Sequence, residues 1–154
     1  MTPREYLEEV VEPNLAELAA NYSNIRLSLN AVHAVDALAA HIYYASNGAA
    51  PGKDDTEYRQ ALARLHPEFA LLRDIAKAIK HVRPNRGSPQ TERGDMVEIR
   101  SLGWGEGVWG DGRWGGPPQA VVPLESGHVR VVETVVTNAL NVLKLEMTKY
   151  SLER

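Results

Sequence analysis

The apolar positions of the first third of the chain recur at helical spacing. Beyond Asn14, steps of three and four residues alternate over four heptads, a pattern typical of a long packed helix. The seam consists of Leu15, Leu18, Tyr22, Ile25, Leu29, Val32, Asp36, Ala39 and Tyr43. The spacing predicts one helix from Asn14 to about Asn47-Gly48, where glycine ends it.

A shorter helix is expected before this seam. Thr2 can cap its first turn, Pro3 suits the first helical position, and Glu5 completes a Thr-x-x-Glu capping box. Pro13 is expected to interrupt this helix, because proline has no N–H to donate.

Two further helices are predicted after the loop AAPGKDD. The first covers Thr56 to Leu65, and the second begins at Pro67 and continues to Arg83, where Pro84 stops it. The apolar stripe of the second comprises Leu72, Ile75, Ile79 and Val82.

The pattern then changes to short β-segments. Residues 84–95 are expected to form a loop, and MVEIR (96–100) a strand. QAVVPLE and HVRVVE flank Ser126-Gly127, which predicts a hairpin with a two-residue turn. The final helix is expected from Glu133 to Leu152. Its helically spaced residues are Val136, Ala139, Leu143 and Met147.

These elements predict an α+β fold that is mainly α. A bundle of about four helices (1–83 and 133–152) carries a small Gly/Trp-rich β insertion (about 95–132) before its last helix. A chain of 154 residues can bury about two-thirds of its unfolded surface, so we expect a single domain, 1–154.

Composition narrows the classes of function. The chain has no cysteine, which excludes disulfides, thiolate metal sites and cysteine nucleophiles. No apolar run reaches the roughly 20 residues that cross a bilayer, and the start, MTPREYLEEVVEP, is acidic where a signal peptide would be basic. We therefore expect a cytoplasmic protein without membrane contact.

Charge is distributed unevenly behind a net value of −3. Residues 1–57 hold nine acidic and three basic side chains, whereas 73–86 hold five basic side chains and one acidic one. The basic stretch could bind phosphate or an acidic partner, including the acidic half of another copy. The alternative is a solvated helix face.

Asp36 occupies the centre of a seam whose other members are apolar or aromatic. A buried carboxylate without a partner would be costly, so it must be protonated, paired or metal-bound. His33 lies one turn earlier on the same side, and the i, i+3 spacing occurs in metal sites of helical bundles. His33 and Asp36 are therefore candidate metal ligands or an acid/base pair. A buried polar pair that sets helix register is the alternative.

The helix after Pro67 carries a second polar constellation. Asp74 and His81 are seven residues apart and share a face, which Arg73, Lys77 and Lys80 border. This face could bind a phosphodiester, with His81 moving a proton and Arg73 stabilising charge. It could equally be an exposed face with weak ion pairs.

The long first helix and the segment LLRDIAKAIKH resemble uncharacterised bacterial HEPN-like helical bundles. HEPN ribonucleases carry an arginine, often followed by a polar residue, and then a histidine after four to six residues. Arg73, Asp74 and His81 follow that order, but seven residues separate the arginine from the histidine. The resemblance covers roughly 14–83 and 133–152. It implies a homodimer and, at these three residues, metal-independent cleavage of RNA.

The densest local pattern is GWGEGVWGDGRWGG (103–116), which we call the Gly/Trp segment. It contains Trp104, Trp109 and Trp114 at five-residue intervals. Alternating glycines allow positive φ and tight turns. The indoles could cover the helices as a lid, bind a partner protein with Arg113 adding a cation–π contact, or form a platform for a small molecule.

Signatures of nucleotide and serine chemistry are missing from the chain. The segment has neither the GxGxxG spacing nor a Walker lysine, and no GxSxG motif occurs, so no cofactor is expected. We expect a non-catalytic interaction or structural protein with a HEPN-like bundle. A HEPN-type ribonuclease or toxin and a helical metal-binding protein are the alternatives.

Overall fold

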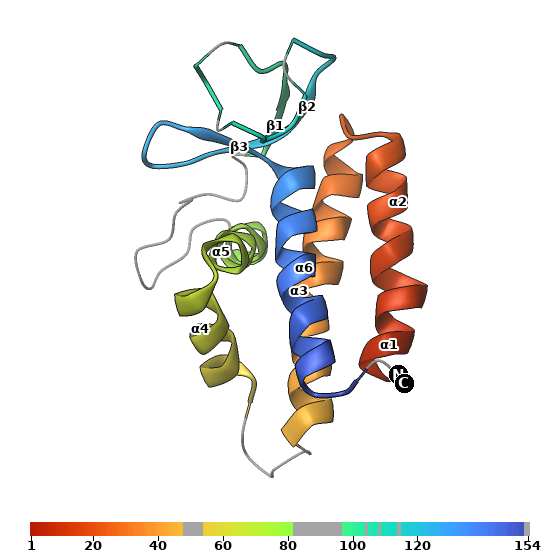
Figure 1. Cartoon of the computed structure of the whole chain (residues 1–154). Coiled ribbons are helices and arrows are strands. Elements are labelled where there is room, and N and C mark those ends of the chain that lie inside the picture. The colour runs from red at the N-terminus through yellow and green to blue at the C-terminus, as the bar shows by residue number, and fades with distance from the viewer. Residues whose placement is uncertain (48–53, 82–96, 104, 108, 114, 153–154) are drawn as a thin grey trace.

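The computed structural model describes residues 1–47, 54–81, 97–103, 105–107, 109–113 and 115–152. Its longest helices run side by side, the helix at residues 67–81 lies across them, and a small sheet stands at one end, away from the two chain termini (Figure 1). The chain is thus mainly helical, with an antiparallel sheet before its last helix, which confirms the expected fold class. Within the described ranges, no helix is long and apolar enough to cross a membrane.

The chain begins with one continuous helical rod. It consists of α1 (Pro3–Tyr6), the π-helical segment η1 (Leu7–Val11) and α2 (Glu12–Ala20). The capping box is confirmed, because the Thr2 amide donates to Glu5 Oε2 at 2.8 Å and the Glu5 amide to Thr2 Oγ1 at 3.2 Å. The predicted interruption at Pro13 is wrong. Pro13 lies in the first turn of α2, and the wider π-turn before it accommodates the missing N–H without ending the rod.

The predicted single helix from Asn14 to Asn47 is also wrong. The chain turns back at Asn21–Asn24, and α3 (Ile25–Asn47) then runs beside α2 (Figure 1). Asn24 Oδ1 accepts a hydrogen bond from the Leu27 amide at 3.3 Å and so caps the new helix. Asparagine and serine side chains here compete with the helical backbone, and this local effect outweighs the continuous apolar period.

The remaining helices begin within one residue of their predicted starts, and the last one ends at Lys149 rather than at the predicted Leu152. They are α4 (Thr56–Leu65), α5 (Pro67–His81) and α6 (Val132–Lys149); the rest of the predicted range to Arg83 lies outside the described residues. Helices α3, α5 and α6 pack against one another around the main core. Fully buried members of this core include Val32, Leu38, Ile42, Phe69, Leu72, Ile75, Val136 and Leu143.

The sheet has the order β1 (Glu98–Arg100), β2 (Gln119–Pro123), β3 (Val129–Val131), with antiparallel pairing. The β2–β3 hairpin differs from prediction, because Leu124 N donates to His128 O at 2.8 Å and leaves a three-residue loop. Gly127, with φ of 83°, supplies the left-handed residue of this loop. The sheet is joined to the bundle where the Ala120 amide donates to Tyr22 O in the α2–α3 turn.

Candidate functional site

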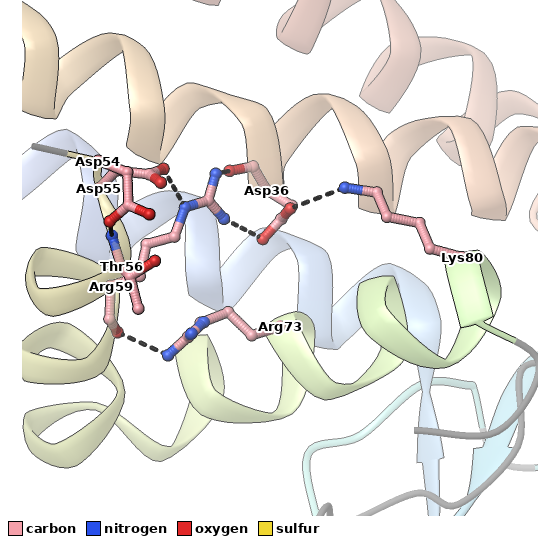
Figure 2. A network of polar contacts seen from close by, with 7 residues as sticks. All are labelled: Asp36, Asp54, Asp55, Thr56, Arg59, Arg73 and Lys80. Carbon is pink, nitrogen blue, oxygen red and sulfur yellow. Dashed lines mark hydrogen bonds and ion pairs between the residues drawn. The ribbon is translucent and has the colours of Figure 1, made fainter. Parts of the chain in front are cut away.

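Asp36 lies at the centre of an ionic network that joins three helices (Figure 2). Its residue surface is only 7% exposed. Arg59 of α4 approaches it twice: Nη1 lies 2.6 Å from Oδ1, and Nη2 donates to the Asp36 backbone oxygen at 2.9 Å. The Arg59 Nε also pairs with Asp55, one helical turn earlier. The buried carboxylate is therefore paired with a guanidinium from a different helix.

The same network reaches α5. Arg73 Nη1 donates to the Arg59 backbone oxygen at 2.9 Å, which ties α5 to α4. Lys80 Nζ lies 3.9 Å from Asp36 Oδ2, but its side chain is 57% exposed, so this pair contributes little to stability. Burial lowers the pKa of Arg59, but Asp36 and Asp55 outweigh it and raise that pKa. Burial and the neighbouring Arg59 lower the pKa of Arg73.

His33 and Asp36 line one open groove, with a volume of about 640 Å³, together with Tyr6 and Lys80. Burial lowers the pKa of His33, the Lys80 charge adds to this, and Asp36 opposes it. Within the part of the chain that is described, no three histidine or acidic side chains gather as metal ligands. Asp36 Oδ1 is already paired with Arg59, and Oδ2 lies 3.9 Å from Lys80 Nζ. The metal interpretation of this pair stays a prediction.

The candidate catalytic residues of α5 are only partly described. Arg73 is half-buried and holds the α4 backbone, and Asp74 is half-buried. His81 is the last residue of α5, and its side chain lies outside the described residues. Catalysis by Arg73, Asp74 and His81 therefore stays a prediction, while the described contact of Arg73 joins two helices.

Three glycines of the Gly/Trp segment share a left-handed φ. Gly105, Gly110 and Gly115 each follow a tryptophan, and their φ values are 85°, 82° and 62°. A Cβ added at any of the three would meet open space, so the left-handed backbone itself requires glycine there. The five-residue period of the sequence thus corresponds to a recurring turn.

Polar contacts fix this segment to β3. Asp111 is 2% exposed, and its Oδ2 accepts from Arg130 Nε at 2.8 Å and from the Val131 amide at 2.9 Å. The Val129 amide donates to the Glu106 backbone oxygen at 3.1 Å. The segment therefore occupies amide groups of an edge strand that would otherwise be open to pairing.

Arg113 and the buried Gln119 hold the other end of the segment. The Gln119 side-chain amide accepts from Arg113 N at 3.2 Å and donates to Arg113 O at 3.0 Å. The Arg113 guanidinium lies 3.8 Å from the ring centroid of Tyr22 and 3.4 Å from Glu133. The cation–π contact expected of Arg113 is made within the chain, to the α2–α3 turn.

Trp109 is the one tryptophan that the described residues include, and it is 90% exposed. The lid interpretation is wrong for this indole, because a residue covering the bundle would be buried. Trp104 and Trp114, the other two predicted partner-binding tryptophans, lie outside the described residues. A large apolar ring thus projects from a turn whose backbone is fixed at both sides.

Sequence reasoning missed Arg59 and Asp111, the two residues that organise these sites. The i, i+4 spacing of Asp55 and Arg59 was a weak signal of an ion pair. The sequence places an acid two residues after Trp104 and again after Trp109, and this repetition was the signal that Asp111 has a structural role.

Comparison with protein-family models, with curated proteins and with solved structures finds no match for this chain. The resemblance to HEPN-like bundles stays a prediction.

Proposed function

We propose that this protein is a non-catalytic interaction protein in which the helical bundle supports a binding surface on the Gly/Trp segment. The observation that carries the proposal is the 90% exposure of Trp109. Tryptophan is enriched among the residues that dominate binding energy at interfaces, and a solvent-exposed indole gains apolar burial only when a partner covers it.

The backbone around Trp109 supports the same conclusion. Asp111 fixes the turn to β3 two residues after the indole, and the Glu106 carbonyl fixes it three residues before. A ring presented on a fixed backbone loses little conformational freedom on binding, which favours affinity. The side chains first considered for catalysis, Asp36 and Arg73, are meanwhile engaged in contacts between helices.

Replacement of Trp109 by alanine tests the proposal. We expect Trp109→Ala to weaken partner binding by about 2 kcal/mol, roughly 30-fold in Kd, because an interface anchor is removed. The measurement is affinity capture from cells that produce the protein, followed by titration of the captured partner.

Leu145→Ala is the matched control, since Leu145 is an apolar side chain of α6 that is 69% exposed. This variant should capture the partner as the parent protein does, and both variants should keep the parent melting temperature. Equal capture by Trp109→Ala and the parent protein would rule the proposal out.

A further inference from the structure

Helix α4 is attached to the rest of the protein mainly by polar contacts. Of its ten residues, all of which the structure describes, only Leu62 is buried, whereas α6 buries eight of its residues. Figure 1 shows α4 at the edge of the bundle, where it packs against α5. Segments with few buried apolar contacts open at a lower free energy than the core does. Helix α4 is therefore the element whose position depends most on its ion pairs.

Arg59 makes two contacts between α4 and α3. Its Nη1 lies 2.6 Å from Asp36 Oδ1, and its Nη2 donates to the Asp36 backbone oxygen at 2.9 Å. Tyr58 adds a ring stack on Tyr43, with centroids 5.7 Å apart. If α4 moved away, Arg59 would leave with it, and the Asp36 side chain, which is 9% exposed, would lose this partner. A buried carboxylate without a partner is costly, so opening is favoured only where a second cation replaces Arg59.

Lys80 of α5 is positioned to replace it. Its Nζ lies 3.9 Å from Asp36 Oδ2, on the side of the carboxylate opposite to Arg59 (Figure 2). This distance is too long for a hydrogen bond, and the Lys80 side chain is 57% exposed, so the pair contributes little while Arg59 is bound. The flexible lysine stem can close the remaining gap of about 1 Å by a change of rotamer.

We infer that α4 opens as a unit and that Lys80 takes the place of Arg59 on Asp36 in the open state. The ion pair is then exchanged rather than broken. Arg59 also keeps a partner, because Asp55 lies on α4 and moves with it. Repulsion between the two cations that share Asp36 in the closed state acts in the same direction.

One further contact must break when α4 opens. Arg73 Nη1 donates to the Arg59 backbone oxygen at 2.9 Å and ties α5 to α4. Both groups can bond to water once α4 has moved, so the net cost of this exchange is small. The opening is independent of Trp109, and it adds a conformational change to the proposed binding role.

Hydrogen exchange of the full chain, measured for each amide by NMR, tests the inference. In the parent protein, the α4 amides should share one opening equilibrium and exchange at least about tenfold faster than the slowest amides of α3 and α6. Their exchange should depend only weakly on urea, because the opening of one helix exposes little surface.

Lys80→Met decides which state Lys80 stabilises. If Lys80 holds the open state, this variant should slow the exchange of the α4 amides by about threefold, the effect of one partly exposed ion pair. The urea midpoint of the whole chain should stay at the parent value. A lysine that only supported the closed helix would give faster exchange. Lys77→Met is the matched control, because it replaces an exposed lysine one turn earlier on α5 and should leave α4 exchange unchanged.

Arg59→Gln gives a second comparison. This variant should speed up α4 exchange, because the contact with Asp36 is weakened in the closed state. In this background Lys80 can pair with Asp36 in both states, so adding Lys80→Met should no longer slow the exchange.

Two results would overturn the inference. Exchange of the α4 amides as slow as that of α3 in the parent protein would show that α4 opens only with the whole fold. Unchanged or faster α4 exchange in Lys80→Met would show that Lys80 does not hold the open state. Neither result bears on partner binding by Trp109.

Discussion

At the scale of single residues, the chemistry of the chain is concentrated in buried acids that organise their surroundings. Asp36 holds Arg59 of another helix, and Asp111 holds an arginine and a backbone amide of β3. Removing one partner of a buried ion pair is destabilising because the other charge stays buried without compensation. Replacing either acid should therefore lower the free energy of unfolding, which can be measured directly.

We expect Asp36→Asn to lower the free energy of unfolding by about 2 kcal/mol, because Arg59 loses one charged partner and keeps Asp55. The double variant Asp36→Asn with Arg59→Gln should lose at least about 1 kcal/mol less than the sum of the two single changes. Urea denaturation of all four proteins gives this coupling energy.

Glu8→Gln serves as the control, because Glu8 pairs with Arg4 at the surface and should change stability by less than about 1 kcal/mol. Additive effects of the Asp36 and Arg59 changes would show that the pair is not coupled.

His33 should make stability depend on pH. Its folded-state pKa lies below the ordinary value of 6.5, mainly through burial, so below pH 6.5 the unfolded chain binds this proton first. Stability from this group is present above pH 6.5 and is lost as the pH falls toward the folded-state pKa. Denaturation between pH 7.5 and 5.5 should show a smaller pH dependence in His33→Gln than in the parent; identical slopes would contradict this. Asp36, Lys80 and Tyr6 line the same groove as His33, and the charges of Lys80 and Asp36 act on its pKa in opposite directions.

At the scale of elements, turns and caps decided where helices and strands end. Asn24 caps α3 and so separates it from α2, although the apolar period continues across the break. In the Gly/Trp segment, the glycines permit left-handed turns that bring Asp111 to β3. A few local residues determine the backbone conformation of each turn. They do not determine which strand or helix the turn contacts.

Two glycines of the segment should respond differently to alanine. Gly110→Ala meets open space and bears only the left-handed backbone strain, about 1–2 kcal/mol. Gly112→Ala has the same strain, and its Cβ would also lie 2.4 Å from Val131 Cγ2 and 2.8 Å from the Gln119 side-chain oxygen. We expect it to lose at least about 3 kcal/mol in thermal or urea unfolding. Equal losses would mean that Val131 and Gln119 move aside freely.

At the scale of the whole molecule, the sheet and the bundle are joined both along the chain and by a backbone hydrogen bond. The last helix, α6, starts at Val132 directly after β3, and the α2–α3 turn bonds to β2. The Gly/Trp segment, which is bonded to β3, presents Trp109 to solvent at the sheet end of the bundle.

We expect the two parts to unfold together. All three tryptophans lie in the Gly/Trp segment, so tryptophan fluorescence reports that segment, while circular dichroism at 222 nm reports the helices. The two signals should give the same urea midpoint. Asp111→Ala, which releases the segment from β3, should move the fluorescence midpoint below the dichroism midpoint. Separate midpoints in the parent protein would show that the segment is only loosely attached.

The sequence by itself determined the mainly helical α+β class, the range of α4, the start of α5 and the strands before the last helix. These follow from local periodicity, proline positions and turn residues, which act over a few neighbouring positions. Only the tertiary structure decided that Asp36 pairs with Arg59, that α2 and α3 are separate helices, and that Trp109 faces solvent. The first outcome depends on which side chain, distant in sequence, reaches the buried Asp36. The position of Trp109 depends on the hydrogen bonds between the Gly/Trp segment and the free amide groups of the edge strand β3. Spacing along the chain does not encode either one.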